Sequence, residues 1–256
     1  MKRVVSRGLL VTVILVLLLV SGSGTALAAP EITLPRFGLQ IEGAETPQDT
    51  AVSLQILFML TILALAPSIL IMMTSFTRIV IVLSITRNAL GLQQTPPNQV
   101  LIGLALFLTF FIMAPIMGEI YEDAYQPFVE GRISQEDALE KGMAPLREFM
   151  FKQTYKKDMN LFVDLAKMER PETLEDIPTR VLIPAFIVSE LKKAFQMSFL
   201  IYIPFIVVDM VVASTLMSMG MMMLPPIMIS LPFKILLFIM VDGWGMIIKT
   251  LVTSFK

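Results

Sequence analysis

Uncharged apolar runs alternate with one polar segment along the chain. The first run, 50–77, holds 28 residues without a charge, and a second is centred on 101–118. Two further runs, 194–208 and 210–233, follow with single charges between them. About 20 apolar residues cross a bilayer as a helix. The pattern therefore predicts four hydrophobic helices, of which the first two form a hairpin through the turn at 91–98.

Prolines and isolated charges break up these runs. Pro67 lies in the middle of the first run and predicts a kink or a break there. A charge at the centre of a bilayer costs about 2.5–3.5 kcal/mol, and the C-terminal runs carry several. The helices after residue 183 are therefore expected to face protein or water over much of their length. Their prolines are Pro184, Pro204, Pro225, Pro226 and Pro232.

Residues 119–182 are polar, with 14 acidic and 9 basic side chains and no apolar run of membrane length. Ser134 to Asp137 resemble a capping box and predict the start of a helix, and Pro145 is expected to open another. The segment is interpreted as a small helical region outside the membrane whose acidic residues form a solvated face. Helical spacing predicts two apolar faces, Leu146, Phe149 and Met150 on one and Phe162, Leu165 and Ala166 on the other.

The N-terminus is typical of a secretory signal. Basic residues precede an apolar run at 9–20, which rises only about 18 Å as a helix, too short for a hydrocarbon core of about 30 Å. An A-x-A site ends at Ala28; an uncleaved anchor helix is the alternative. The predicted organisation is a signal peptide at 1–28, a short exported segment at 29–50, a first hydrophobic hairpin at 51–118, the polar segment at 119–182 and C-terminal hydrophobic helices at 183–256.

Composition sets the class and excludes several activities. Hydrophobic residues make up 55% of the chain and charged residues 16%, whereas average domains have about 25% charged residues. The chain is therefore interpreted as an all-α membrane protein. Without Cys or His it offers no thiol chemistry, no Ser-His-Asp triad and no His or Cys metal site. We expect no enzyme activity, cofactor or metal, and the balance of 20 basic and 21 acidic residues argues against binding nucleic acid.

Topology rules place the turn at 91–98 inside the cell and the polar segment outside. Arg78 and Arg87 then mark the inner end of the first hairpin, and neither is assigned any chemistry. Lys192 and Lys193 would lie on the outer side of the third helix, against the positive-inside trend. Simple spanning topology is therefore expected to fail in the C-terminal part.

A series of short motifs covers roughly residues 52–248. The strings are MMTSFTR at 72–78, RNALG at 87–91, PPNQV at 96–100, DAYQPF at 123–128, PLREFM at 145–150, PAF at 184–186, SEL at 189–191, GMMM at 220–223, LPFK at 231–234 and VDGW at 241–244. Together, in this order, they resemble the FliP family, the flagellar biosynthesis proteins of the type III export gate.

This resemblance implies helical hairpins, raised out of the ordinary membrane plane, that assemble into an oligomeric ring or cone. It implies a homo-oligomer, a pentamer, that joins FliQ-like and FliR-like subunits and works with FlhA-like and FlhB-like export components. The implied place is the bacterial inner membrane at the flagellar basal body, and the implied cargo is unfolded export substrates. The signal at the N-terminus favours the flagellar branch over the injectisome relatives.

Methionine is the densest chemical signal, with 20 in the chain and five between residues 217 and 223. Because Met is flexible, it commonly fills gaps in cores, and composition alone favours that interpretation. However, three consecutive Met point in three directions on a helix, and Gly220 together with Pro225 predicts a loop. In the FliP family this is the Met-rich gasket loop, so the resemblance assigns a pore seal to Met219, Met221, Met222 and Met223.

Glu190, Asp209, Lys234 and Asp242 are ionisable residues in or beside apolar runs, and such residues are paired or functional. We expect structural ion pairs, with Glu190 bound to Lys234, within or between subunits. Removing one partner of a buried pair costs about 3–5 kcal/mol. A Lys234 that reaches headgroup water from a helix end is equally consistent with the sequence.

A small-solute or ion transporter or channel is the alternative function, because it shares Pro-broken helices and buried charges. Four short helices without an inverted repeat leave little room for a midplane site, and thioethers are poor ligands for hard cations. No Walker-type phosphate loop is present. Energy for transport would therefore come from another component.

Overall fold

The computed structural model describes residues 47–168, 171, 173–174, 176–221 and 223–255. Every regular element in these ranges is helical, which confirms the all-α prediction. The predicted signal peptide and most of the segment 29–50 lie outside the described residues. The chain divides into two units, 1–55 and 56–256, and the helix packing belongs to the second.

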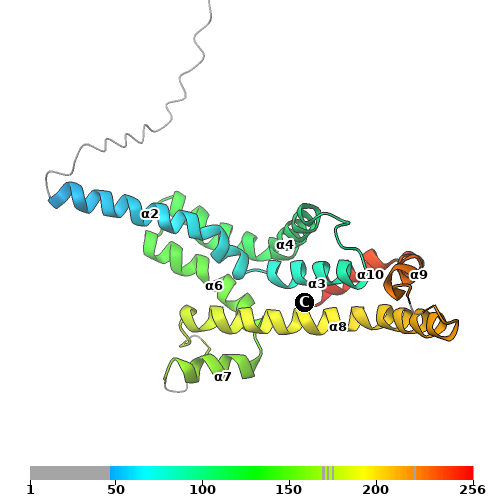
Figure 1. Ribbon diagram of the computed structural model, residues 1–256. Coiled ribbons are helices and arrows are strands. Elements are labelled where there is room, and N and C mark those ends of the chain that lie inside the picture. Colours follow the sequence, from blue (N-terminus) through cyan, green and yellow to red (C-terminus); the bar gives the residue numbers. More distant parts are fainter. Residues whose placement is uncertain (1–46, 169–170, 172, 175, 222, 256) are drawn as a thin grey trace, which may run out of the picture. The chain divides into compact units, whose positions relative to one another are not determined.

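Three helices form the first part of the described chain (Figure 1). Helix α2 spans Pro47–Met72, α3 spans Phe76–Ala89 and α4 spans Asn98–Ile120. Of the kink or break predicted at Pro67, the break is wrong, because α2 continues through that proline and ends at Met72. Met73, Thr74 and Ser75 are buried. The chain therefore turns where its side chains enter the core, not where a single backbone hydrogen bond is lost.

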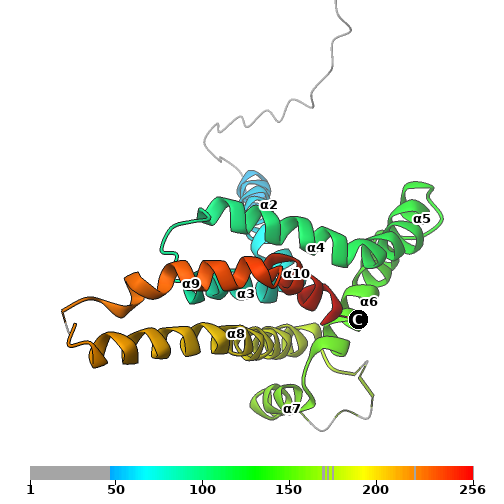
Figure 2. The same ribbon diagram turned by 90° about the vertical axis from the view of Figure 1, so that its right-hand side faces the viewer.

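Helix α3 lies between α4 and α8 in both views (Figures 1 and 2). Helix α4 buries one narrow stripe of residues spaced four apart, which are Leu101, Ala105, Thr109 and Met113. This spacing keeps a single face of the helix toward its neighbours. The other faces of α4 are also apolar, and Phe107, Phe110 and Phe111 are exposed. The helix is thus covered on one side only.

The first part of the polar segment is mostly helical. A π-helix at Tyr121–Tyr125 and α5 at Gln126–Val129 continue α4, and α6 spans Gln135–Gln153. The predicted capping box is confirmed: the Ser134 hydroxyl accepts from the Asp137 N–H at 3.1 Å, and the Asp137 carboxylate accepts from the Ser134 N–H at 3.4 Å. The prediction that Pro145 starts a helix is wrong, because α6 continues through this residue. The turns of α6 that follow Pro145 pack against α8.

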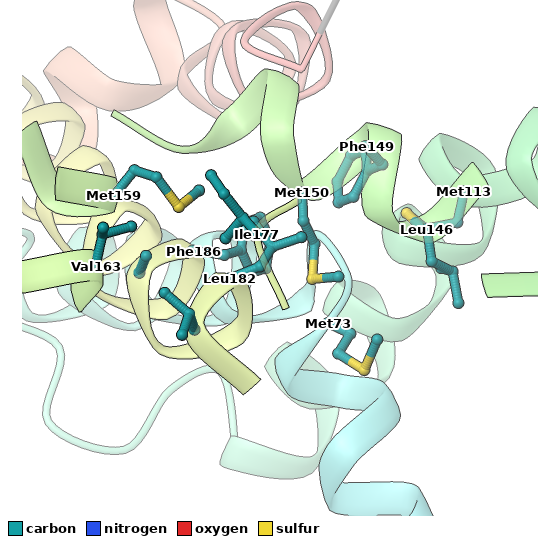
Figure 3. Packing of buried hydrophobic residues seen from close by; sticks show 12 residues of the cluster. Met73, Met113, Leu146, Phe149, Met150, Met159, Val163, Ile177, Leu182 and Phe186 are labelled. Atoms are coloured by element: carbon teal, nitrogen blue, oxygen red, sulfur yellow. The ribbon is translucent and has the colours of Figure 1, made fainter. Parts of the chain in front are cut away.

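One core cluster joins α6, α7 and the start of α8 (Figure 3). Leu146, Phe149 and Met150 are buried in it, as predicted. The predicted second face is wrong in part: Phe162 packs against the cluster, but Leu165 is 67% exposed, and α7 (Lys156–Leu165) buries Met159 and Val163. Asp158 is also buried and binds α8. The face of α7 that packs is therefore the one that carries Asp158, Met159 and Val163.

The C-terminal part contains one very long helix and one bent pair. Helix α8 spans Thr179–Ser218, 40 residues, and passes through Pro184, Pro204 and every charge that was expected to interrupt it. It continues because neighbouring helices supply partners for those charges. Helix α9 spans Pro226–Met240 and α10 spans Gly243–Thr253, with a bend of 62° between them.

Two continuous helical stretches among the described residues, Asn98–Val129 and helix α8, are long and apolar enough to cross a membrane, and the bent pair α9–α10 adds a third if it forms one span. The apolar stretch of α2, Ser53–Ile69, is shorter.

The bend between α9 and α10 depends on close packing at a glycine. Asp242 has the left-handed φ of +50°, which Asp adopts more readily than most residues. At Gly243, a Cβ atom would lie 2.2 Å from the ring of Phe238. That ring also packs edge-on against Trp244, with 5.3 Å between the ring centroids.

Replacing Gly243 with Ala should therefore destabilise the chain. Overpacking of this kind costs about 1–3 kcal/mol, and we expect a clear fall in Tm in thermal unfolding of the detergent-purified chain. Gly103→Ala is the matched control, since nothing lies within 4 Å of its Cβ position in α4 and Ala favours a helix by up to about 1 kcal/mol. Equal Tm values for the two variants would contradict the packing argument.

Candidate functional site

The predicted loop between Gly220 and Pro225 is present. Helix α8 ends in a glycine-based cap, in which Gly220 has a φ of +73° and the N–H groups of Gly220 and Met221 donate to the carbonyls of Met217 and Leu216, each at 3.0 Å. Pro225 is the N-cap of α9. Residues 219–225 are referred to here as the methionine loop.

The side chains of the methionine loop that the structure describes lie uncovered in the single chain. Met223 is 98% exposed, and Met219 and Met221 are exposed as well. Met222 lies outside the described residues. Met217, one turn earlier on α8, is also exposed. The structure thus places the predicted thioethers together at one helix-to-helix connection without a partner among the described residues.

An ion pair joins the two helices that flank the loop. The Lys234 ammonium of α9 donates to the Asp209 carboxylate of α8 at 2.6 Å and to the carbonyl of Ala89, at the end of α3, at 3.2 Å. The Ser230 hydroxyl donates to the other oxygen of Asp209 at 2.5 Å. Lys234 is 3% and Asp209 30% exposed. This group, the α8–α9 clamp, ties the helices together at Asp209 and Lys234, each within three turns of the loop.

The expected pair between Glu190 and Lys234 is not formed within the chain. Lys234 binds Asp209, and Glu190 binds Arg78. Asp242 forms no ion pair with any residue that the structure describes. Its carboxylate lies against Gly245 at the N-terminus of α10, where a negative charge is favourable to the helix dipole.

Arg78 is the centre of a second group, the Arg78 cluster. Its guanidinium is 1% exposed and binds both oxygens of the fully buried Glu190, with Nε 2.8 Å from Oε2. The remaining donors reach the Gln153 amide oxygen at 2.9 Å and the carbonyl and hydroxyl oxygens of Ser254 at 3.0 and 2.8 Å. The ring of Phe255 lies 3.7 Å from the guanidinium carbon. One side chain of α3 therefore connects α6, α8 and the end of α10.

A second cation completes the Arg78 cluster. The Lys193 ammonium donates to the backbone and side-chain oxygens of Gln153 at 2.7 and 2.8 Å, and lies 3.8 Å from Glu190. Buried charges are tolerated only when their hydrogen bonds are made. Here two cations share one carboxylate, and neutral oxygens supply the other acceptors.

The sequence contained a signal for Arg78 that was not used. Arg78 is the only charge among residues 50–86, and Glu190 is the only acid among residues 183–208. A lone cation and a lone carboxylate in two apolar stretches are natural partners, because neither can stay unpaired in an apolar setting. Gln153, Ser254 and Phe255 carried no such signal.

A third polar contact docks α7 on α8. The buried carboxylate of Asp158 accepts from the Ser189 hydroxyl at 2.8 Å and pairs with Lys192. Burial of Asp158 alone would raise its pKa, but the hydrogen bonds from Lys192 and Ser189 outweigh it and hold the pKa below the usual value. One acidic residue of the polar segment is thus structural, against the prediction of a solvated face.

These contacts account for the topology conflict at Lys192 and Lys193. Lys192 pairs with Asp158 of α7, and Lys193 binds Gln153 of α6. The positive-inside trend describes cations in loops that flank a membrane span, whereas these two lie within a helix and hold the polar segment. They therefore give no information about which side of the membrane they occupy.

Fold and sites together define a class of protein. It is an all-helical membrane protein whose described helices pack through apolar clusters that contain a few buried polar and charged residues, leave apolar surface outward and carry a methionine-rich loop at one connection. Comparison with known proteins identifies the group within this class. The chain belongs to the FliP family, whose family model matches residues 59–251.

Curated relatives agree with this assignment over most of the chain. A flagellar biosynthetic protein FliP of Bacillus subtilis (strain 168) is 57% identical over 217 residues, which cover 85% of this chain and 98% of that protein. One of Pectobacterium carotovorum subsp. carotovorum is 54% identical over 81% of both chains. One of Borreliella burgdorferi is 53% identical over 81% of this chain and 83% of that protein.

The α8–α9 clamp yields a prediction about stability. In Asp209→Asn the buried Lys234 cation keeps only neutral oxygens, and we expect a loss of about 3 kcal/mol in the free energy of unfolding. Adding Lys234→Met should recover most of it, because no charge then stays buried. Unfolding of the detergent-purified chain is the measurement. Lys152→Met, in an exposed pair with Glu148, is the control and should leave Tm unchanged, while a double variant as unstable as the sum of the singles would refute the pairing.

The dock of α7 yields a prediction about pH. Because the pKa of Asp158 is lowered in the folded chain, its contribution is fully present above the unfolded-state pKa of about 3.9 and is lost as the pH falls through the lower folded value. The difference in unfolding free energy between the wild type and Asp158→Asn should be constant from pH 7 to 5 and shrink below about pH 4. Asp164→Asn, exposed on the same helix, should have no effect at pH 7. A difference that shrinks already between pH 7 and 5 would contradict the assignment.

Proposed function

We propose that this chain is a core subunit of the flagellar type III protein-export gate in the bacterial inner membrane. Copies of the chain, a pentamer, join FliQ-like and FliR-like subunits and contact FlhA-like and FlhB-like export components. The assembly passes unfolded flagellar substrates, and the methionine loop seals it when no substrate is present. Support comes from membership of the FliP family, from relatives named as flagellar biosynthetic proteins, and from the geometry of the loop.

One observation carries the proposal: flexible apolar side chains are gathered at a loop where the chain offers them no cover. Met219, Met221 and Met223 are exposed, and burying apolar surface stabilises by about 25 cal/mol per Å². An exposed apolar surface of this kind is stabilised when other subunits or a lipid cover it. Because the loop joins two helices of membrane character, copies arranged around an axis would bring several loops to the same depth.

Methionine is suited to a seal that must open. Its unbranched side chain has three rotatable bonds and repacks around irregular shapes. Several such side chains can exclude water and ions when they meet, and can deform around a passing polypeptide of any sequence, because no polar group has to be matched. Charged or strongly hydrogen-bonding side chains would instead select particular cargo.

The α8–α9 clamp supports the same role by holding the frame of the loop. Asp209 and Lys234 lie on the two helices that enter and leave it, and their contact is largely buried. The glycine cap at Gly220 and the proline at 225 then end both helices abruptly. The clamp thus holds α8 and α9 in fixed relative positions, while the methionine loop between them can change conformation. A gate at a fixed position requires both properties.

Replacing Met221, Met222 and Met223 with Ala tests the proposal. In flagellated cells whose own FliP protein is replaced by this chain, the variant should assemble and export but leak small ions, because the shorter side chains cannot meet across the axis. Ion leak is measured as the rise in permeability when the gate is expressed. A triple variant with Ala at Met210, Met240 and Met246, all exposed and outside the loop, is the matched control and should not leak.

Assembly is measured in parallel by gentle detergent extraction and native mass analysis. A large multi-subunit particle with unchanged leak in the loop variant would refute the seal but leave the gate subunit intact. A monomer or dimer that moves a small solute would refute the gate itself and favour a transporter.

A further inference from the structure

The last described residues of the chain end inside the Arg78 cluster. Arg78 donates to the carbonyl of Ser254 at 3.0 Å and to its hydroxyl at 2.8 Å, and the Gln153 amide donates to the carbonyl of Phe255 at 3.2 Å. The Phe255 ring covers one face of the guanidinium and stacks on Phe149 of α6. Figure 2 shows the end of α10 beside α6.

The end of α10 supplies negative potential that the cluster lacks. Arg78 and Lys193 carry two positive charges, and Glu190 carries one negative charge. The final carbonyls of a helix have no partners within it and form the negative end of the helix dipole. The carbonyl of Ser254 is such a group, so docking of α10 balances charge as well as filling space.

The cluster is incomplete without these two residues. Within the described chain, Ser254 provides both acceptors of the Arg78 Nη1 group, and Phe255 provides the ring over its face. A buried donor left without an acceptor loses the whole benefit of its hydrogen bonds and remains desolvated. Undocking of the end of α10 would therefore affect α3, α6 and α8, which contribute the rest of the cluster.

Apolar packing alone does not hold Phe255 in place on its other side. A groove of about 330 Å³ opens beside it, between α4, α6 and the end of α10. Phe255 is partly buried and packs against both apolar clusters, and the guanidinium, the Gln153 amide and the stacked ring of Phe149 fix its position relative to α6. It therefore lies at the edge of the core, with packing on one side and a groove on the other.

We propose that Ser254 and Phe255 form a C-terminal latch for which Arg78 is the positioning residue: docking of the arm 226–255 completes the buried cluster, and only then are the end of α6 and the start of α8 fully stabilised. The arm carries one side of the methionine loop. Because of the latch, the arm 226–255, and with it this side of the methionine loop, docks on the rest of the chain only when the polar segment is folded. It rests on the contacts of the single chain and holds whether or not the loop seals a pore.

Hydrogen exchange on the full-length chain in detergent tests the latch. In the double variant with Ser254→Ala and Phe255→Ala, amides of residues 149–155 at the end of α6 should exchange about tenfold faster or more, although about 100 positions separate them from the substitutions. Arg78→Lys keeps the charge but loses the fork of donors, and it should accelerate exchange in 249–255 to a similar degree.

Thr253→Ala is the matched control. Its hydroxyl is exposed and bonds only to carbonyls of its own helix, at Lys249 and Thr250, so exchange in 149–155 should not change. Faster exchange in the double variant that is confined to 243–255 would overturn the latch. If the double variant does not accumulate as a folded chain, Phe255→Leu keeps an apolar side chain without the ring; exchange in 149–155 equal to the wild type would then overturn the proposal, and a severalfold increase would support it.

Discussion

A buried guanidinium is the constraint on which the described fold depends. Arg78 has five N–H donors, no access to water and a single carboxylate within reach. Burying such a charge is tolerated only if every donor finds an acceptor. The acceptors come from three other elements, which are α6, α8 and the end of α10. These elements are far apart in sequence and also pack through apolar clusters, and the hydrogen bonds of one side chain add a geometric requirement that they must meet together.

The same logic explains why buried polar residues occur within an interior that is mostly apolar, in a chain whose outer surface is also apolar. The buried stripe of α9 is Ser230, Lys234 and Phe238, while Ile227, Phe233 and Ile239 of the same helix are exposed. In water this arrangement would be unfavourable by roughly 25 cal/mol for each Å² of uncovered apolar surface. It is stable where lipid or other subunits cover the outer surface. The helices of one chain meet through apolar clusters and a few specific polar contacts, and further apolar surface is left for the surroundings.

Local signals in the sequence predicted local structure well, but they did not predict the long-range contacts. The capping box at Ser134 and the loop after Gly220 depend on residues a few positions apart, and both are present. Pro67 was expected to kink or break a helix and Pro145 to start one, yet each lies inside a helix, because a proline removes one backbone hydrogen bond and the remaining bonds of the helix still form. The partner of Glu190 lies 112 positions away. Opposite charges in apolar runs show that pairing must occur, but not which pairs form, because that depends on how the helices cross.

The positions of the polar contacts also show where the chain is free to change shape. The Arg78 cluster holds one end of α8 and the end of α10, and the α8–α9 clamp holds the two helices nearer the methionine loop. Between Ser218 and Pro226 no side-chain hydrogen bond or ion pair joins the described loop residues to another element. Fully made polar contacts resist deformation because breaking one leaves a buried group unpaired, whereas thioether contacts are exchanged at little cost. The chain thus combines a polar frame that must keep its geometry with one connection that need not, and that difference follows from the kind of side chain at each place.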